Sequence, residues 1–123
     1  MSTFTPAELD AVGAAEELQI ASVRDDGTLR PFVTIWAVRA GDDIYVRSAH
    51  GRNNGWFRRA LASGTGRVRA GGVEKDVTFE LVPGGDIQDA IDAAYHSKYD
   101  RYGAAFVNPV VGEPAHEATL RVN

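Results

Sequence analysis

The residues with the clearest chemical potential lie between Ile44 and Trp56, where a predicted strand runs through a glycine-containing loop into a predicted helix. The first turn of a helix has free backbone N–H groups and the positive end of the helix dipole, and both favour a bound anion. Arg47 and Arg52 can add charge-assisted hydrogen bonds, and Ser48 can add a hydroxyl. A terminal phosphate of a nucleotide-like cofactor is the ligand that this combination predicts. A capped helix with ordinary surface arginines explains the same residues equally well.

The charge distribution favours a localised anion over a long polyanion. The chain has a net charge of −4, yet the stretch from Arg47 to Lys75 holds seven basic residues and one acid. That stretch is therefore +6 and the remainder −10, a pattern that makes nucleic-acid binding the weaker interpretation. We expect at least half of these basic side chains to lie on solvated faces of strands and a helix.

Other kinds of chemistry lack their residues. The chain has no cysteine, which excludes disulfides, thiol nucleophiles and thiolate metal sites. His50, His96 and His116 are far apart in sequence and no pair has helical metal-ligand spacing, so no metal is expected. No stretch is long and apolar enough for a membrane span and no signal peptide is visible, so we expect a cytoplasmic protein that does not enter membranes.

The pattern of turns and apolar residues predicts a single domain over residues 1–123 of the α+β class, with a mainly antiparallel sheet of six strands closed into a barrel and flanked by helices. Helices are expected from Pro6 to about Gly13, from Asn53 or Asn54 to about Ala62, and from Asp86 to about Asp100. Strands are expected at Leu18–Arg24, Phe32–Arg39, Ile44–Ser48, Gly66–Ala70, Val73–Leu81 and Ala118–Val122.

Several segments occur in the order seen in a known superfamily. They are Pro31–Val38, Gly41–Ser48, Trp56–Ala60 and Gly66–Ala70. The chain resembles the split-barrel proteins, which include pyridoxamine-phosphate-oxidase-like flavoproteins and deazaflavin-dependent nitroreductases. Within that superfamily it is most similar to a group of uncharacterised bacterial proteins, on the evidence of the strand pair Val68–Phe79 and the helix Ala93–Tyr99. The similarity covers nearly the whole chain.

The resemblance implies FMN or a deazaflavin as the cofactor and a homodimer as the assembly. It implies eight cofactor-binding positions. Four of them hold the cofactor phosphate, namely Arg47, Ser48, Arg52 and Trp56. The other four, on the strand that lines the isoalloxazine ring, are Val33, Thr34, Ile35 and Trp36. Two departures from the superfamily pattern stand out: arginines occupy positions 58 and 59 of the expected helix, and the helix from Asp86 to Tyr102 has no counterpart in the minimal barrel.

Two functions follow from this resemblance. The first is an oxidoreductase that moves a hydride between the bound cofactor and a small organic acceptor. Since the cofactor supplies the reactive atom, no catalytic side chain is predicted. Arg39, Arg67 or Arg69 could then stabilise the reduced ring. The second is a non-catalytic protein that binds or carries a flavin or another phosphate-bearing ligand.

Overall fold

The computed structural model describes residues 4–49, 51–82 and 84–123. Its α-helices are α1 Pro6–Ala14, α2 Gly55–Ser63, α3 Ile87–Tyr99 and α4 Ala104–Val107. Its strands are β1 Leu18–Ser22, β2 Val33–Ile35, β3 Ala37–Ala40, β4 Asp43–Arg47, β5 Thr65–Ala70, β6 Val73–Leu81 and β7 Thr119–Val122. Three short 3-10 helices, Asp100–Tyr102, Asn108–Val110 and Ala115–Ala118, follow α3 in the chain.

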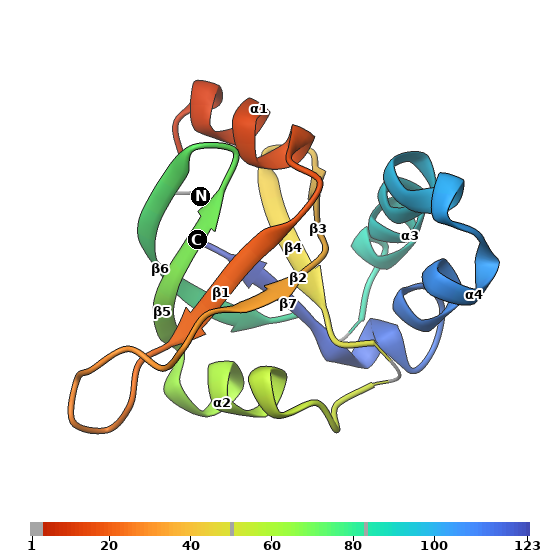
Figure 1. Cartoon of the computed structure of the whole chain (residues 1–123). Helices are drawn as coiled ribbons and strands as arrows, with labels where there is room; N and C mark the ends of the chain where they lie inside the picture. Colours follow the sequence, from red (N-terminus) through yellow and green to blue (C-terminus); the bar gives the residue numbers. More distant parts are fainter. Residues whose placement is uncertain (1–3, 50, 83) are drawn as a thin grey trace.

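The strands form one antiparallel sheet in the order β2-β1-β5-β6-β7-β4-β3, which curls into a split barrel (Figure 1). The predicted α+β class and antiparallel barrel are confirmed, but the sheet has seven strands rather than six. The difference arises at Trp36, where the predicted strand Phe32–Arg39 divides into β2 and β3. These two strands are the edges of the sheet and are consecutive in the chain, so the backbone at Trp36 bridges the split.

Local sequence signals explain where α1 begins and where the β5–β6 hairpin turns. Thr5 accepts a hydrogen bond from the backbone of Glu8, whose side chain accepts one from the Thr5 backbone, which completes a capping box ahead of Pro6. Gly71 and Gly72 both have positive φ, as a two-residue hairpin loop requires. Helix α1 covers one end of the barrel and α2 the other (Figure 1).

The molecule has two apolar cores. The larger one fills the barrel and holds fully buried residues such as Ile44, Val46 and Phe57. The second lies between the outer face of β3 and β4 and the C-terminal segment, where Tyr95 and Tyr99 of α3 are fully buried. Helix α3, which has no counterpart in the minimal barrel, thus packs its apolar stripe against the barrel.

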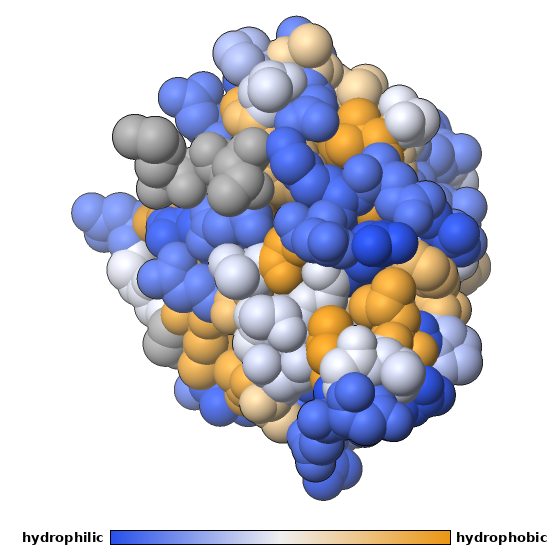
Figure 2. All heavy atoms as spheres, turned by 90° about the vertical axis from the view of Figure 1, so that its left-hand side faces the viewer, coloured by the Kyte–Doolittle hydropathy of each residue, from blue (hydrophilic) through white to orange (hydrophobic). Residues whose placement is uncertain are grey.

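The opposite side of the barrel is polar. Figure 2 shows the face on the β6 side, where hydrophilic residues predominate and apolar side chains reach the surface only in small separate patches. Strand β6 explains the pattern, since its exposed residues alternate with buried ones. Within the described part of the chain, no helix is both long and apolar enough to cross a membrane.

Candidate functional site

Most of the residues implied as cofactor-binding lie around one pocket. It has a volume of about 280 Å³, and six of the eight line it. The six are Val33, Thr34, Ile35, Trp36, Arg47 and Trp56. The wall is completed by Ala49, Asn54, Phe106 and Val110. We call this space the β2 pocket, because the edge strand β2 and the Trp36 junction form one whole side of it.

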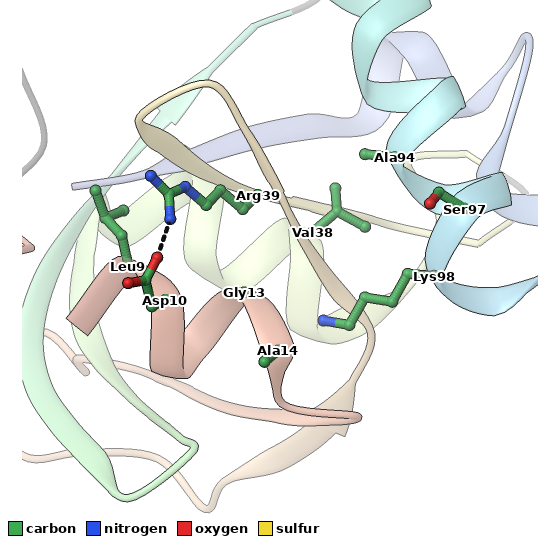
Figure 3. Close-up of a pocket in the computed structure, with 9 residues that line it drawn as sticks. All are labelled: Leu9, Asp10, Gly13, Ala14, Val38, Arg39, Ala94, Ser97 and Lys98. Carbon is green, nitrogen blue, oxygen red and sulfur yellow. Dashed lines mark hydrogen bonds and ion pairs between the residues drawn. The ribbon is translucent and has the colours of Figure 1, made fainter. Parts of the chain in front are cut away.

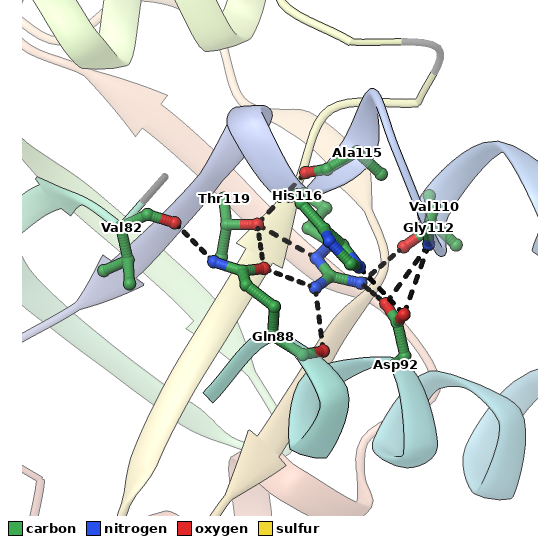
Figure 4. Close-up of polar contacts among 9 residues, drawn as sticks. Val82, Gln88, Asp92, Val110, Gly112, Ala115, His116 and Thr119 are labelled. Carbon is green, nitrogen blue, oxygen red and sulfur yellow. Dashed lines mark hydrogen bonds and ion pairs between the residues drawn. The ribbon is translucent and has the colours of Figure 1, made fainter. Parts of the chain in front are cut away.

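Arg47 lines the β2 pocket, and its guanidinium is bound by the protein itself. Figure 4 shows its partners Gln88, Asp92 and Thr119. Nε donates to Thr119 Oγ1 at 3.0 Å, one terminal nitrogen donates to Asp92 and to the Val110 carbonyl, and the other donates to the backbone and side-chain oxygens of Gln88. An arginine side chain has five N–H donors, and these contacts use all five. Arg47 is therefore a buried structural cation with no donor left for a phosphate.

The carboxylate opposite Arg47 belongs to a larger polar network. Asp92 also pairs with His116 Nε2 at 2.8 Å and accepts from the Gly112 backbone. Burial raises the pKa of Asp92, but hydrogen bonds from His116 and Arg47 outweigh it and hold that pKa below its ordinary value. The network joins β4, α3 and the segment before β7, so it anchors the C-terminal segment to the barrel. Gln88 and Asp92 are four residues apart on one side of α3, which was the sequence signal for this contact.

Ser48 and Arg52 do not line the β2 pocket. Ser48 is fully buried, and its hydroxyl accepts a hydrogen bond from Asn54 Nδ2 at 2.9 Å. Arg52 is exposed and donates through Nε to the Glu117 carbonyl at 2.9 Å. The structure thus separates these two residues from the four on β2 and at Trp36. His50, between them in sequence, lies outside the described residues.

The side chains at the start of α2 differ from those expected to hold an anion. Asn54 is the N-cap residue, but its side chain turns back to Ser48 and the Ala49 carbonyl and makes no capping bond. The first-turn amides of this nine-residue helix are thus left without the usual side-chain acceptor. Arg59 folds back over the same turn, so that a Cβ at Gly55 would lie 2.7 Å from its Nη1. In the sequence, Arg59 stood out only as a departure from the superfamily pattern.

Two further arginines lie near the start of α2. A cavity of about 500 Å³ is lined by Arg30, Arg58 and Arg59, with Asp25 as the acid beside them. None of the three makes an ion pair with a described carboxylate. A narrower crevice places Arg30 and Arg59 beside Val33 and Trp56, which also line the β2 pocket. Unpaired positive charge therefore lies next to the β2 pocket on the side of α2.

The three arginines suggested for the reduced ring lie elsewhere. Arg39 pairs with Asp10 and Asp42, and Arg67 pairs with Asp76 and Glu74. The guanidinium of Arg69 lies 3.7 Å from the ring centroid of Phe32. None of them is among the residues that line the β2 pocket.

The indole of Trp36 is held in place by α3. It stacks on the ring of Tyr99 with centroids 4.0 Å apart and planes 4° from parallel. The Tyr99 hydroxyl donates to the Glu16 carbonyl and accepts from the Ala37 backbone N–H, so the backbone just after Trp36 is fixed as well. Burial raises the pKa of Tyr99 to about 12, so this hydroxyl keeps its proton. Helix α3 thus positions one wall of the β2 pocket.

Known proteins were compared with this sequence and fold. A family model described as uncharacterised proteins conserved in bacteria (DUF2255) matches residues 8–122. The chain belongs to this family. No curated protein matches the sequence.

Among residues 4–49, 51–82 and 84–123, no group of three acidic or histidine residues is placed to hold a metal ion.

Solved structures share the fold at low sequence identity. A conserved hypothetical protein from Mycobacterium tuberculosis matches with a TM-score of 0.66 and 12% identity, over 98% of this chain and 79% of the other. An F420-H2-dependent reductase matches with a TM-score of 0.65 and 15% identity, over 88% and 94%. An FAD-binding protein from Mesorhizobium loti matches with a TM-score of 0.58 and 18% identity, over 97% and 88%. These matches show that the chain has the split-barrel fold.

Proposed function

We propose that the protein binds a phosphate-bearing flavin or deazaflavin and acts as an oxidoreductase on a small organic acceptor. The observation that carries the proposal is the position of the β2 pocket directly beside the uncapped start of α2. Proteins of the same fold are described as an F420-H2-dependent reductase and as an FAD-binding protein, which supports a cofactor of this class. Such a cofactor supplies hydride transfer, and the protein binds and orients it and excludes water.

The β2 pocket fits the flat ring of such a cofactor. Trp36, Ile35 and Trp56 supply apolar and aromatic surface. As an edge strand, β2 pairs only with β1, so one side of its backbone is available for the polar edge of a ring. A volume of about 280 Å³ lies just below the range of small-molecule sites, roughly 300 to 1,000 Å³, so it suits a ring whose side chain extends outside.

The phosphate of the cofactor would bind at the first turn of α2. Its free amides and the helix dipole attract an anion, and Arg59 places a guanidinium over the same turn. Arg59 would then hold the phosphate, the role that the resemblance implies for Arg47, Ser48, Arg52 and Trp56. Arg30 and Arg58 add positive charge at the entrance to this site.

The first test measures the contribution of Arg59 to cofactor binding. Isothermal titration calorimetry with FMN, and separately with a deazaflavin, measures the affinity of the wild type and of Arg59→Met. Loss of charge-assisted hydrogen bonds should weaken binding roughly ten- to hundredfold. Arg67→Met is the matched control, because that arginine lies on β5 with two acidic partners. Absence of saturable binding of either cofactor by the wild type would contradict the proposal.

A non-catalytic carrier is the second candidate, and one observation favours it. Arg47 is the one ionisable residue among those that line the β2 pocket, and its donors are all engaged. Turnover of reduced cofactor with a panel of quinones and nitroaromatics distinguishes the two candidates. Saturable cofactor binding without turnover on any acceptor would favour the carrier.

We also propose that a second copy of the chain covers the β2 pocket. The side chain of Phe106 at its rim is exposed although it is large and apolar, and the free edge of β2 lies beside it. One protein of the same fold is described as a domain-swapped dimer. Light scattering should give a dimer for the wild type and a monomer for Phe106→Ser. Leu61→Ser, which changes an exposed residue on α2, should stay dimeric, and a monomeric wild type would contradict the proposal.

A further inference from the structure

A second pocket lies between α1, β3 and α3 (Figure 3). Its volume is about 390 Å³, and it shares no lining residue with the β2 pocket. Leu9, Gly13, Ala14, Val38 and Ala94 form the apolar part of its wall, which is about as extensive as the polar part. Its polar lining residues are Asp10, Arg39, Ser97 and Lys98. We call this space the α1–α3 pocket.

Lys98 is the cation of the α1–α3 pocket that lacks an acidic partner. Its ammonium group extends from α3 toward α1 (Figure 3) and donates to the Ala37 carbonyl at 2.7 Å. No described carboxylate lies within ion-pair distance of it. An ammonium group has three donors, so two remain for a ligand. Burial lowers the pKa of Lys98 to about 8, which reflects the cost of holding a charge here without a counter-ion.

The second cation of the pocket is already neutralised. Arg39 forms an ion pair with Asp10 at 2.6 Å, and its other terminal nitrogen lies 3.5 Å from Asp42. Its Nε donates to the Gly41 carbonyl. The pocket therefore offers one uncompensated positive charge beside an apolar wall. A dianion such as phosphate would need a second free cation, whereas a monoanion with a hydrocarbon part matches both features.

We propose that the α1–α3 pocket binds a small aliphatic carboxylate. The carboxylate pairs with Lys98 Nζ, and the hydroxyl of Ser97, one residue earlier on α3, lines the same wall. The hydrocarbon part lies against Val38 and Ala94. This site is independent of the cofactor site, because nothing in its lining belongs to the β2 pocket.

Titration of the wild type with sodium butanoate, followed by two-dimensional ¹H–¹⁵N NMR at pH 7 against sodium chloride of equal ionic strength, tests the proposal. The amides of Gly13, Val38 and Ala94 should shift and saturate. Lys98→Met, which keeps most of the length of the side chain without its charge, should weaken the affinity for butanoate at least tenfold. Lys98→Arg should retain part of that affinity. Butan-1-ol, which has the same hydrocarbon part and no charge, should bind the wild type at least tenfold more weakly than butanoate.

Several results would overturn the proposal. They are the absence of saturable shifts at tens of millimolar butanoate, equal affinity for butanoate and butan-1-ol, and unchanged affinity in a folded Lys98→Met. If that variant does not fold, the comparison of the two probes on the wild type still decides. Cofactor is absent throughout, so the outcome does not depend on the function of the β2 pocket.

A pH series on the wild type gives a second readout. The charged groups that surround Lys98 are Asp10 on α1, Glu16 after it, Arg39 on β3 and Arg101 beyond α3, with Tyr99 adjacent in the chain. Glu16 is held ionised by Tyr102 and Arg101, which lower its pKa, and Tyr99 titrates only near 12. Affinity for butanoate should therefore fall as the pH rises through 8, and saturating butanoate should raise the pKa of Lys98 measured from its ε-methylene shift. An affinity that is flat between pH 7 and pH 9 would contradict the assignment.

Discussion

A single side chain, Arg47, determines how the C-terminal segment is attached to the barrel. Its guanidinium donates hydrogen bonds to α3, to β7 and to the 3-10 helix Asn108–Val110, all of which lie more than forty residues away in sequence. Removing one partner from a buried ion pair leaves an uncompensated charge, which typically costs about 3–5 kcal/mol. We therefore interpret Arg47 as a residue that stabilises the fold, which leaves anion recognition by Arg59 as the proposal to be tested.

Asp92→Asn should reduce the free energy of unfolding at pH 7 by roughly 3 kcal/mol, since Arg47 then lacks its counter-charge. Because the pKa of Asp92 is lowered in the folded state, its contribution is fully present above the unfolded value near 4 and is lost as the pH falls through the folded value. Urea unfolding of both proteins between pH 7 and pH 2.5 measures this. The difference in stability should shrink as the pH falls below about 4, and a difference constant with pH would contradict the interpretation.

Contacts between neighbouring elements depend on close backbone approach. The β5–β6 hairpin meets α1 so closely that a Cβ at Gly71 would lie 2.3 Å from the Ala11 carbonyl oxygen. At Gly72 the φ is also positive, yet no atom lies within 4 Å of the Cβ position. Comparing alanine substitutions at Gly71 and Gly72 therefore distinguishes the free-energy cost of a left-handed backbone from the free-energy cost of a steric collision.

Gly72→Ala should lower the free energy of unfolding by about 1 kcal/mol, the usual cost of a left-handed alanine. Gly71→Ala should cost about 1–3 kcal/mol more, because α1 must move away from the hairpin. Thermal and urea unfolding of both variants provide the comparison. Equal destabilisation of the two would show that α1 is not held against this turn.

The elements themselves were largely predictable because their signals are local. The capping box of Thr5 and Glu8 set the start of α1, and Gly71 and Gly72 set the β5–β6 turn. The break at Trp36 was not predicted, because residues 32–39 form one run of strand-forming residues without a glycine or proline to mark it. The cofactor roles suggested for Val33 to Trp36 stay predictions, and the contacts of Arg47 and Ser48 depend on partners that no local pattern identifies.

Across the whole chain, tertiary contacts neutralise many of the positive charges that are close together in the sequence. The stretch from Arg47 to Lys75 is strongly basic in sequence, but tertiary contacts occupy most of its cations. Asp92 neutralises Arg47, Glu8 pairs with Lys75, and Asp76 with Glu74 neutralises Arg67. Arg58 and Arg59 stay unpaired among the described residues, which leaves a small basic site on an acidic protein rather than a basic face.

We expect no saturable binding of double-stranded DNA at physiological salt, since a protein that holds DNA needs many phosphate contacts from a continuous basic surface. Fluorescence anisotropy with a labelled duplex is the measurement, with single-stranded DNA as a second probe. Tight binding with a steep dependence on salt would restore nucleic acid as a ligand and would count against a localised anion site.

The two tryptophans of the chain, Trp36 and Trp56, both line the β2 pocket. All tryptophan fluorescence of this protein therefore comes from residues at the proposed cofactor site. One of the two emitters is stacked on Tyr99, and the other meets Phe57 edge-on with ring centroids 6.0 Å apart, so their spectra should differ and single Trp→Phe variants should resolve them. Tryptophan fluorescence can therefore report on ligand binding. A cofactor ring that binds in the β2 pocket should quench the emission of both indoles by energy transfer. A ligand in the α1–α3 pocket should leave the emission of Trp56 unchanged.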